Sequence, residues 1–227
     1  MIDAIIFDLD GVLVDSEPVM FASTNSVLGL RDAVLERDDY DRCRGMGEIE
    51  FFTLLAEKFG LDDAPSVMAR ERVIDSLQRM AAQTMLPMNG ALPALLSLVG
   101  EGYRLAVASA SRRPHVELVV EKLGIRRLMK AVVSLDDVSR GKPEPDLFLE
   151  AARRIGVQPA RCLVVEDAVF GVQAAQRAGM ASIALPPPGD DGARHLEAGA
   201  LAALESLLEL TPEAVEAWDA LSADSGA

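Results

Sequence analysis

Five short apolar runs, separated by stretches with helical spacing, constrain the fold of this chain more than any other feature. They lie at residues 4–7, 103–108, 131–133, 162–165 and 181–185. Their apolar residues are continuous rather than alternating, which is typical of strands buried on both faces, as in a parallel sheet. Strands that alternate with helices indicate right-handed βαβ crossovers. The sequence therefore predicts an α/β fold with a doubly wound parallel sheet.

The segments between the runs carry the spacing of amphipathic helices. Ala168, Val172 and Ala175 recur at i, i+4 and i+7 ahead of Gly179, which suits a glycine C-cap.

Two more helices are predicted after the last run. Leu201, Leu204 and Leu208 fall on one face of a possible helix. Thr211 followed by Pro212 predicts the start of a final helix, because Thr is a good N-cap and proline is favoured at the first helical position.

Residues 16–87 interrupt the alternation with a stretch that contains no convincing strand. Apolar residues here follow helical spacing in two stripes, which predicts a small helical bundle. The stripes are Phe51, Phe52, Leu54, Leu55 and Phe59, and then Val67, Val73, Ile74 and Leu77. We expect a core domain formed by residues 1–15 and 88–227, with residues 16–87 as an inserted helical cap domain over the carboxyl edge of the sheet.

Composition narrows the class of protein. The chain has 227 residues, 50% of them hydrophobic, and a net charge of −14 from 22 basic and 36 acidic residues. This charge repels nucleic acid and anionic membrane surfaces, so neither is expected as a partner. The N-terminus lacks the positive charge and apolar length of a signal peptide. We expect a cytoplasmic protein, and nothing in the sequence requires more than a monomer.

The cysteines and histidines do not form a recognisable site. Cys43 and Cys162 are isolated, as are His115 and His195. A histidine metal site needs clustered partners, so both histidines are interpreted as packing or surface residues.

Polar side chains gather where four of the predicted strands end. They are Asp8 and Asp10, Ser109 and Ser111, Lys142, and Glu166 with Asp167. A doubly wound sheet places its ligand at the carboxyl ends of its strands. Asp8, Asp10 and Asp167 would supply the hard oxygen ligands that Mg²⁺ prefers. A lysine beside them would screen an incoming phosphate, and a carboxylate could attack phosphorus to form an acyl phosphate.

These motifs resemble those of the haloacid dehalogenase superfamily, in particular its phosphatase branch with a helical cap after the first strand. In chain order they are DLDGVLVDSE (8–17), VASAS (107–111), GKPEPD (141–146) and VEDAVFGVQAAQRAGM (165–180). Together they extend over nearly the whole chain. The resemblance implies a Rossmann-like core and a Mg²⁺-dependent enzyme.

The resemblance also implies a role for each motif residue. Asp8 would be the nucleophile, Asp10 the general acid and base, and Lys142 the bridge between the phosphate and Asp8. Ser109 and the backbone N–H of Ala110 would bind phosphate. The metal ligands would be Asp8, the backbone carbonyl of Asp10, Asp167 and Glu166, the last directly or through a second layer.

Within the family, Asp10 with Glu166 and Asp167 favours phosphoryl transfer over dehalogenation. The core motifs also resemble β-phosphoglucomutase. That mutase has a histidine and a phosphate-binding arginine in its cap where this chain has Met20 and Glu48, and an acid would repel a second phosphate.

The leading hypothesis is therefore a Mg²⁺-dependent phosphatase for a sugar phosphate or a phosphoglycolate-like metabolite. The alternatives are a hexose phosphomutase and a non-enzymatic phosphoacceptor or sensor. A phosphoacceptor or sensor domain would lack the helical insert and would not need Asp10. The cap residues assigned to substrate binding are Arg44, Gly45, Met46, Gly47 and Glu48.

Overall fold

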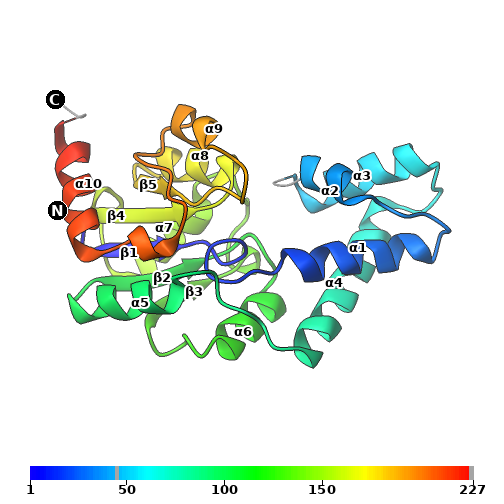
Figure 1. The fold of residues 1–227 in the computed structure, drawn as a ribbon, viewed down its shortest axis with the longest axis horizontal. Helices are drawn as coiled ribbons and strands as arrows, with labels where there is room; N and C mark the ends of the chain where they lie inside the picture. Colours follow the sequence, from blue (N-terminus) through cyan, green and yellow to red (C-terminus); the bar gives the residue numbers. More distant parts are fainter. Residues whose placement is uncertain (44–45, 225–227) are drawn as a thin grey trace. The chain divides into compact units, whose positions relative to one another are not determined.

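The computed structural model describes residues 1–43 and 46–224, with side chains through residue 221. Figure 1 shows the chain as a ribbon. The chain divides into two compact units. The sheet unit comprises Met1–Asp15 and Met85–Ala227, and the helical unit comprises Ser16–Thr84.

The sheet unit is built on five parallel strands in the order β3-β2-β1-β4-β5. Their bounds are Ala4–Phe7 (β1), Arg104–Ala108 (β2), Met129–Val133 (β3), Cys162–Glu166 (β4) and Ala181–Ala184 (β5). β1 is central, and its Ile6 is in register with Ala106 of β2 and Val164 of β4. The order reverses direction at β1, so the predicted doubly wound parallel sheet is confirmed.

Helices cover both faces of this sheet. Figure 1 shows α5 (Ala91–Gly100) and α6 (Arg113–Lys122) on one face, with α7 (Asp146–Ile155) and α8 (Val169–Arg177) on the other. The remaining elements of the unit are α9 (Ala193–Glu197), α10 (Pro212–Asp224) and the 3₁₀ turns η1 (Leu135–Asp137), η2 (Pro159–Arg161) and η3 (Leu207–Glu209). The final helix begins at Pro212, as predicted.

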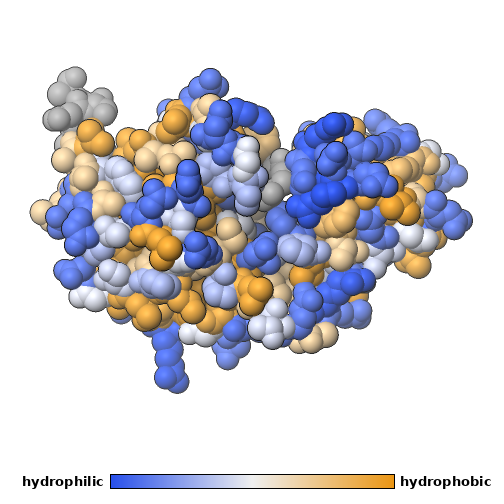
Figure 2. Space-filling model, in the orientation of Figure 1, coloured by the Kyte–Doolittle hydropathy of each residue, from blue (hydrophilic) through white to orange (hydrophobic). Residues whose placement is uncertain are grey.

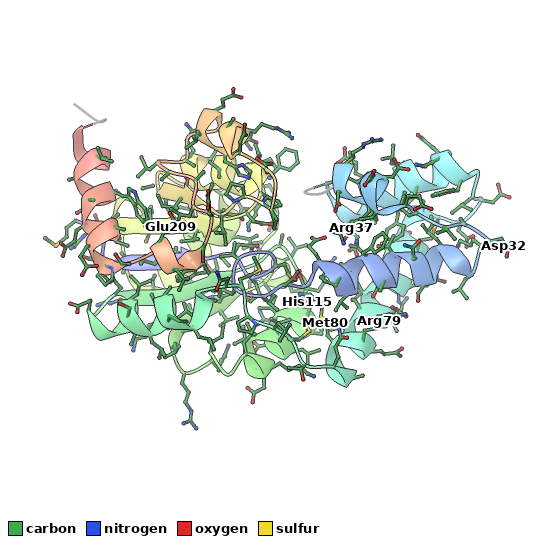
Figure 3. All side chains as sticks on the ribbon, viewed as in Figure 1. Asp32, Arg37, Arg79, Met80, His115 and Glu209 are labelled. Carbon is green, nitrogen blue, oxygen red and sulfur yellow. The ribbon has the colours of Figure 1, made fainter. Side chains whose placement is uncertain are left out.

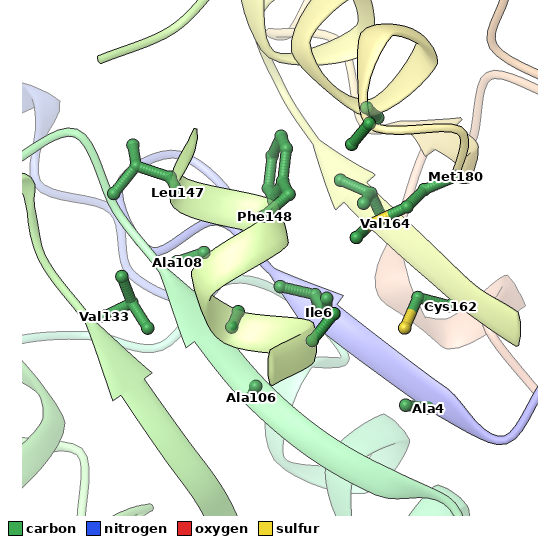
Figure 4. Packing of buried hydrophobic residues seen from close by; sticks show 14 of the residues in the cluster. Ala4, Ile6, Ala106, Ala108, Val133, Leu147, Phe148, Cys162, Val164 and Met180 are labelled. Atoms are coloured by element: carbon green, nitrogen blue, oxygen red, sulfur yellow. The ribbon is translucent and has the colours of Figure 1, made fainter. Parts of the chain in front are cut away.

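The core under α7 buries one face of the strands. Leu147 and Phe148 of α7 are fully buried against Ile6, Ala108 and other strand residues, as Figure 4 shows. Small residues on the strands leave room for the large ones on the helix. Burying a side chain such as Leu or Phe stabilises the fold by roughly 1.5–3 kcal/mol.

The helix predicted from Leu201, Leu204 and Leu208 does not form. The segment instead runs beside β5, where the N–H of Leu201 donates to Ser182 O and that of Leu204 donates to Ala184 O. A short 3₁₀ turn follows, closed by a capping box of Ser206 and Glu209. Hydrogen bonds to the edge strand β5 therefore hold this segment extended, although its leucines have helical spacing.

The helical unit contains α1 (Glu17–Gly29), α2 (Arg37–Arg42), α3 (Glu48–Phe59) and α4 (Pro65–Ala82). Both α1 and α3 pack on α4. α2 carries five charged residues around the buried Tyr40, and Figure 2 shows hydrophilic residues gathered over it. Among the described residues, no helix is both long and apolar enough to cross a lipid bilayer.

One of the two predicted apolar stripes in this unit is wrong. On α3, Phe51, Phe52 and Leu55 are buried, although Leu54 is exposed. On α4, the buried residues are Met68, Ala69, Ser76 and Met80, whereas Val67 and Ile74 of the predicted stripe are exposed. The face of α4 that is buried is the one on which α1 and α3 pack. The spacing of apolar residues alone did not distinguish this face from the predicted one.

A buried carboxylate fixes the loop that follows β3. Asp137 Oδ2 accepts hydrogen bonds from the backbone N–H and the hydroxyl of Ser134, at 2.8 and 3.0 Å. Its Oδ1 accepts from Arg154 of α7 at 2.6 Å and from Arg113 of α6. Burial raises the pKa of Asp137, but these hydrogen bonds outweigh burial and hold the pKa well below its usual range. The carboxylate thus links β3 to a helix on each face of the sheet.

We expect Asp137→Asn to lower the unfolding free energy by about 2 kcal/mol near neutral pH, because hydrogen bonds to a charged group are lost. A folded-state pKa below the unfolded value of 3.8 stabilises the fold above that value, and the stabilisation is lost as pH falls through the folded pKa. Urea unfolding of both proteins should therefore differ at pH 7 and converge in strong acid. The exposed Glu197→Gln, which also removes one charge, is the control, and a deficit independent of pH would contradict the assignment.

Candidate active site

The parallel register brings the ends of three strands together at one edge of the sheet. Phe7 of β1 is paired with Val107 of β2 and with Val165 of β4. The residues that follow these positions include Asp8 and Ser109, and they are adjacent for that reason. The N–H of Asp8 donates to Val165 O at 2.9 Å, which continues the sheet pairing one residue past β1.

Lys142 lies at the centre of the acidic residues at this edge. Its Nζ is 2.6 Å from Asp8 Oδ1 and also pairs with Glu166 Oε1. All three side chains are buried, with Lys142 8% exposed and Glu166 1%. The ammonium also lies over the ring of Phe148, 5.1 Å from its centroid. Lys142 is held by the packing of α7 as well as by charge.

The pKa values in this cluster reflect a surplus of negative charge. The pKa of Asp8 is raised to about 7, because burial, Glu166 and Asp10 together outweigh the attraction of Lys142. For Lys142, burial lowers the pKa, but the attraction of Asp8 and Glu166 outweighs burial and raises it above the usual range. The lysine is therefore charged, and a further cation would favour the ionised form of Asp8.

The same residues fit a divalent metal ion. Asp8, Glu166 and Asp167 each offer an oxygen, and these atoms lie within 4.8 Å of one another. Lys142 pairs with two of these carboxylates, Asp8 and Glu166, and a single positive charge does not balance both of them when both are ionised. Hard oxygen ligands are the preference of Mg²⁺ rather than of soft metals. The donor set and the charge both suit the predicted Mg²⁺.

The carboxylate of Asp10 is near enough to raise the pKa of Asp8, but it is not one of the three carboxylates of the ligand cluster. Its Oδ2 accepts a hydrogen bond from Ser111 Oγ at 2.8 Å, and its Oδ1 is 2.8 Å from His115 Nε2. The residue pattern predicted Asp10 as a metal ligand together with Asp8 and Asp167, but the cluster of ligand oxygens contains Asp8, Glu166 and Asp167 instead. The family resemblance assigned only the backbone carbonyl of Asp10 to the metal, and that assignment stays a prediction.

Ser109 and Ala110 lie directly after β2. Ser109 is buried, and its Oγ accepts a hydrogen bond from the N–H of Ser111 at 3.1 Å. Ala110 is exposed in the bend between the two serines. One short segment therefore carries the predicted phosphate-binding hydroxyl and a serine that contacts Asp10.

Two glycines allow the acidic side chains to fit. A Cβ on Gly171 of α8 would lie 1.9 Å from Glu166 Cδ, and a Cβ on Gly11 would lie 2.3 Å from Asp167 Oδ2. Gly11 also has a φ of +80°, which side-chain-bearing residues rarely adopt. Helix α8 can approach the buried Glu166 only because residue 171 has no side chain.

His195 supports the loop that carries Asp167. It lies in α9, is 2% exposed, and its Nε2 is 2.8 Å from Asp167 O. A carbonyl oxygen can only accept, so Nε2 carries the proton. The sequence interpretation as a packing histidine missed this contact.

The predicted substrate residues of the helical unit are only partly described. Arg44 and Gly45 lie outside the described residues. Met46 and Gly47 are exposed, and Gly47 is the N-cap of α3. Glu48 Oε1 pairs with Arg72 of α4 at 3.0 Å, and Arg72 lies over the ring of Phe51. The charge of Glu48 is therefore balanced within the unit, which weakens the argument that it repels a second phosphate.

Comparison with known proteins agrees with this fold. Residues 5–185 match the family model of the haloacid dehalogenase-like hydrolases. A fructose-1-phosphate phosphatase, YqaB of Escherichia coli, is 35% identical over 79% of this chain and 94% of its own length. A β-phosphoglucomutase of Bacillus subtilis is 28% identical over 79% of this chain and 81% of its own.

A solved structure extends the likeness to three dimensions. CbbY from Rhodobacter sphaeroides, in complex with phosphate, superposes with a TM-score of 0.79 and 26% identity, over 92% of this chain and 96% of that chain. The doubly wound sheet with an acidic site at its carboxyl edge defines a hydrolase of the α/β class. This chain belongs to the haloacid dehalogenase-like hydrolase family, as its motifs predicted.

We expect Gly171→Ala to disturb the site through Glu166, because the new methyl group must displace a fully buried carboxylate. Overpacking of this kind destabilises a protein by roughly 1–3 kcal/mol. Thermal unfolding and Mg²⁺ titration should both show a loss. Gly100→Ala is the matched control, since Gly100 is also helical and a Cβ there would meet nothing within 4 Å. If the two variants had the same unfolding temperature and the same Mg²⁺ affinity, Glu166 would have to move aside without cost, which would contradict the prediction.

Proposed function

We propose that the protein is a Mg²⁺-dependent phosphatase that hydrolyses a small phosphomonoester through a phospho-aspartyl intermediate. The observation that carries the proposal is the position of Lys142 between the buried Asp8 and Glu166, two carboxylates that lie within 4.8 Å of an oxygen of Asp167. A site with a buried carboxylate nucleophile, a fixed ammonium and an oxygen donor set suits phosphoryl transfer, in which positioning and charge supply most of the catalysis.

Asp8, Asp167, Glu166 and the backbone carbonyl of Asp10 would hold the metal. When bound, Mg²⁺ supplies neutralising charge and orients a phosphate oxygen. Lys142 opposes the rise in the pKa of Asp8 without cancelling it, and it would screen the negative phosphate. Because the pKa of Asp8 is raised toward 7 by its surroundings, these cations favour the form that attacks phosphorus.

The reaction then proceeds in two steps. A carboxylate oxygen of Asp8 attacks phosphorus in line, the bond to the leaving oxygen breaks, and Asp10 gives that oxygen its proton. Asp10, now ionised, takes a proton from water as the water attacks the phospho-aspartyl group and releases phosphate and the Asp8 carboxylate. Ser109 Oγ and the Ala110 N–H would hold a phosphoryl oxygen throughout.

The substrate class proposed is a sugar phosphate or a phosphoglycolate-like acid. The support is the likeness to a fructose-1-phosphate phosphatase and the presence of the helical unit. We propose that this unit acts as a cap that closes over the substrate and excludes water. Residues 44–48 would contact the leaving group, with Arg44 as the cation and Glu48 held by Arg72.

The first test is phosphate release from a panel of sugar phosphates, phosphoglycolate, nucleotides and an aryl phosphate, with Mg²⁺ and with chelator. Turnover should require Mg²⁺, and Asp8→Asn should abolish it while the unfolding midpoint is retained, because an amide cannot act as the nucleophile. Residual Mg²⁺-dependent turnover in the variant would contradict the role of Asp8. No hydrolysis across the panel, with conversion of hexose 1-phosphate upon addition of a sugar bisphosphate, would support the mutase instead.

A second test addresses Asp10. We expect Asp10→Asn to slow turnover by about 10²- to 10⁴-fold, the usual range for loss of general acid and base catalysis. Rapid-quench measurement should show both formation and hydrolysis of the phospho-enzyme slowed. A change in KM alone would require a different role for Asp10.

A further inference from the structure

His115 is placed to act on the side chain of Asp10. It lies in the first turn of α6, is labelled in Figure 3, and is only 5% exposed. Its Nε2 is 2.8 Å from Asp10 Oδ1, across 105 residues of sequence. No motif of the sequence singled out this histidine, and the role of Asp10 described above does not use it.

When Asp10 is ionised, the chemistry of the two partners fixes which atom carries the proton. An ionised carboxylate can only accept hydrogen bonds, so Nε2 of His115 carries hydrogen and donates to Oδ1. Ser111 Oγ donates to Oδ2 at 2.8 Å. A serine hydroxyl can rotate and accept instead, whereas a protonated ring nitrogen cannot. Oδ2 can therefore gain or lose a proton and still keep its hydrogen bond with Ser111. Oδ1 cannot be protonated without losing the hydrogen bond from His115.

The histidine is also carried by a rigid element. Val116 and Val119 of the same helix are buried in the sheet unit, with exposures of 1% and 0%. Asp10, by contrast, lies in the loop after β1. A hydrogen bond from a packed helix restricts the carboxylate far more than a contact within the loop would.

We propose that His115 is a positioning residue, which holds Oδ1 of Asp10 and reserves Oδ2 for proton transfer to and from the leaving oxygen. This inference rests on the proposed function, in which Asp10 is the general acid and base.

The test compares substrates with good and poor leaving groups. Proton donation matters greatly for an alkyl phosphate and little for p-nitrophenyl phosphate, whose leaving group is stable as an anion. We expect His115→Ala to lower kcat/KM about 10- to 100-fold for the alkyl phosphate on which the wild type is most active, the scale of a misplaced catalytic group. For p-nitrophenyl phosphate the loss should be under about threefold.

Two further variants separate positioning from packing. His115→Gln retains an N–H near the position of Nε2 and should recover most of the alkyl-phosphate activity. Val116→Ala removes a neighbouring buried side chain from the same helix, so it should lower the unfolding midpoint without changing the ratio of the two kcat/KM values. If His115→Ala leaves that ratio unchanged, or if Val116→Ala shifts it equally, the proposal is overturned.

A measurement without turnover covers the case in which His115→Ala fails to fold. Nitrogen NMR of the metal-free wild type should show the His115 proton on Nε2, and Asp10→Ala should shift that signal; a proton on Nδ1 alone would overturn the proposal. Failure of the proposed function is recognised separately. In that case the wild type shows no Mg²⁺-dependent turnover, or Asp8→Asn retains it, whatever residue occupies position 115.

Discussion

The contact of the Lys142 ammonium with two buried carboxylates, Asp8 and Glu166, is the constraint on which the rest of the structure depends. Buried charges are tolerated only when they are paired, and loss of one partner from such a pair costs about 3–5 kcal/mol. One ammonium cannot neutralise Asp8, Glu166 and Asp167 together. The fold therefore maintains a buried site with excess negative charge, which suits a metal ion and, through it, a phosphate.

The surrounding fold serves to hold these charges at short range. β1 and β4 end side by side, so the pairing of the two strands brings Asp8 and Glu166 close together. Phe148 packs against the sheet and lies under the Lys142 ammonium. Gly171 lets α8 begin close to Glu166. Apolar packing, strand register and the absence of a side chain at Gly171 thus determine how closely the charged groups of the site approach one another.

Both histidines of the chain are buried next to residues of this site. His115 contacts the carboxylate of Asp10, and His195 contacts the backbone carbonyl of Asp167. His115 lies in α6 and His195 lies in α9, so each is distant in sequence from the residue that it contacts. Contacts of this type hold the residues of the candidate site from outside, as hydrogen bonds around metal sites do.

The sequence by itself determined the parallel sheet, the family and the identity of the motif residues, because continuous apolar runs and strand-end polar clusters are local signals. The helical insert was also evident, although spacing alone chose the wrong face of α4, where Val67 and Ile74 are exposed. Only the tertiary structure decided that residues 201–204 extend along β5 rather than forming a helix. Likewise, the contacts of His115 with Asp10 and of Glu48 with Arg72 join distant parts of the chain, and no local pattern of residues encodes such pairs.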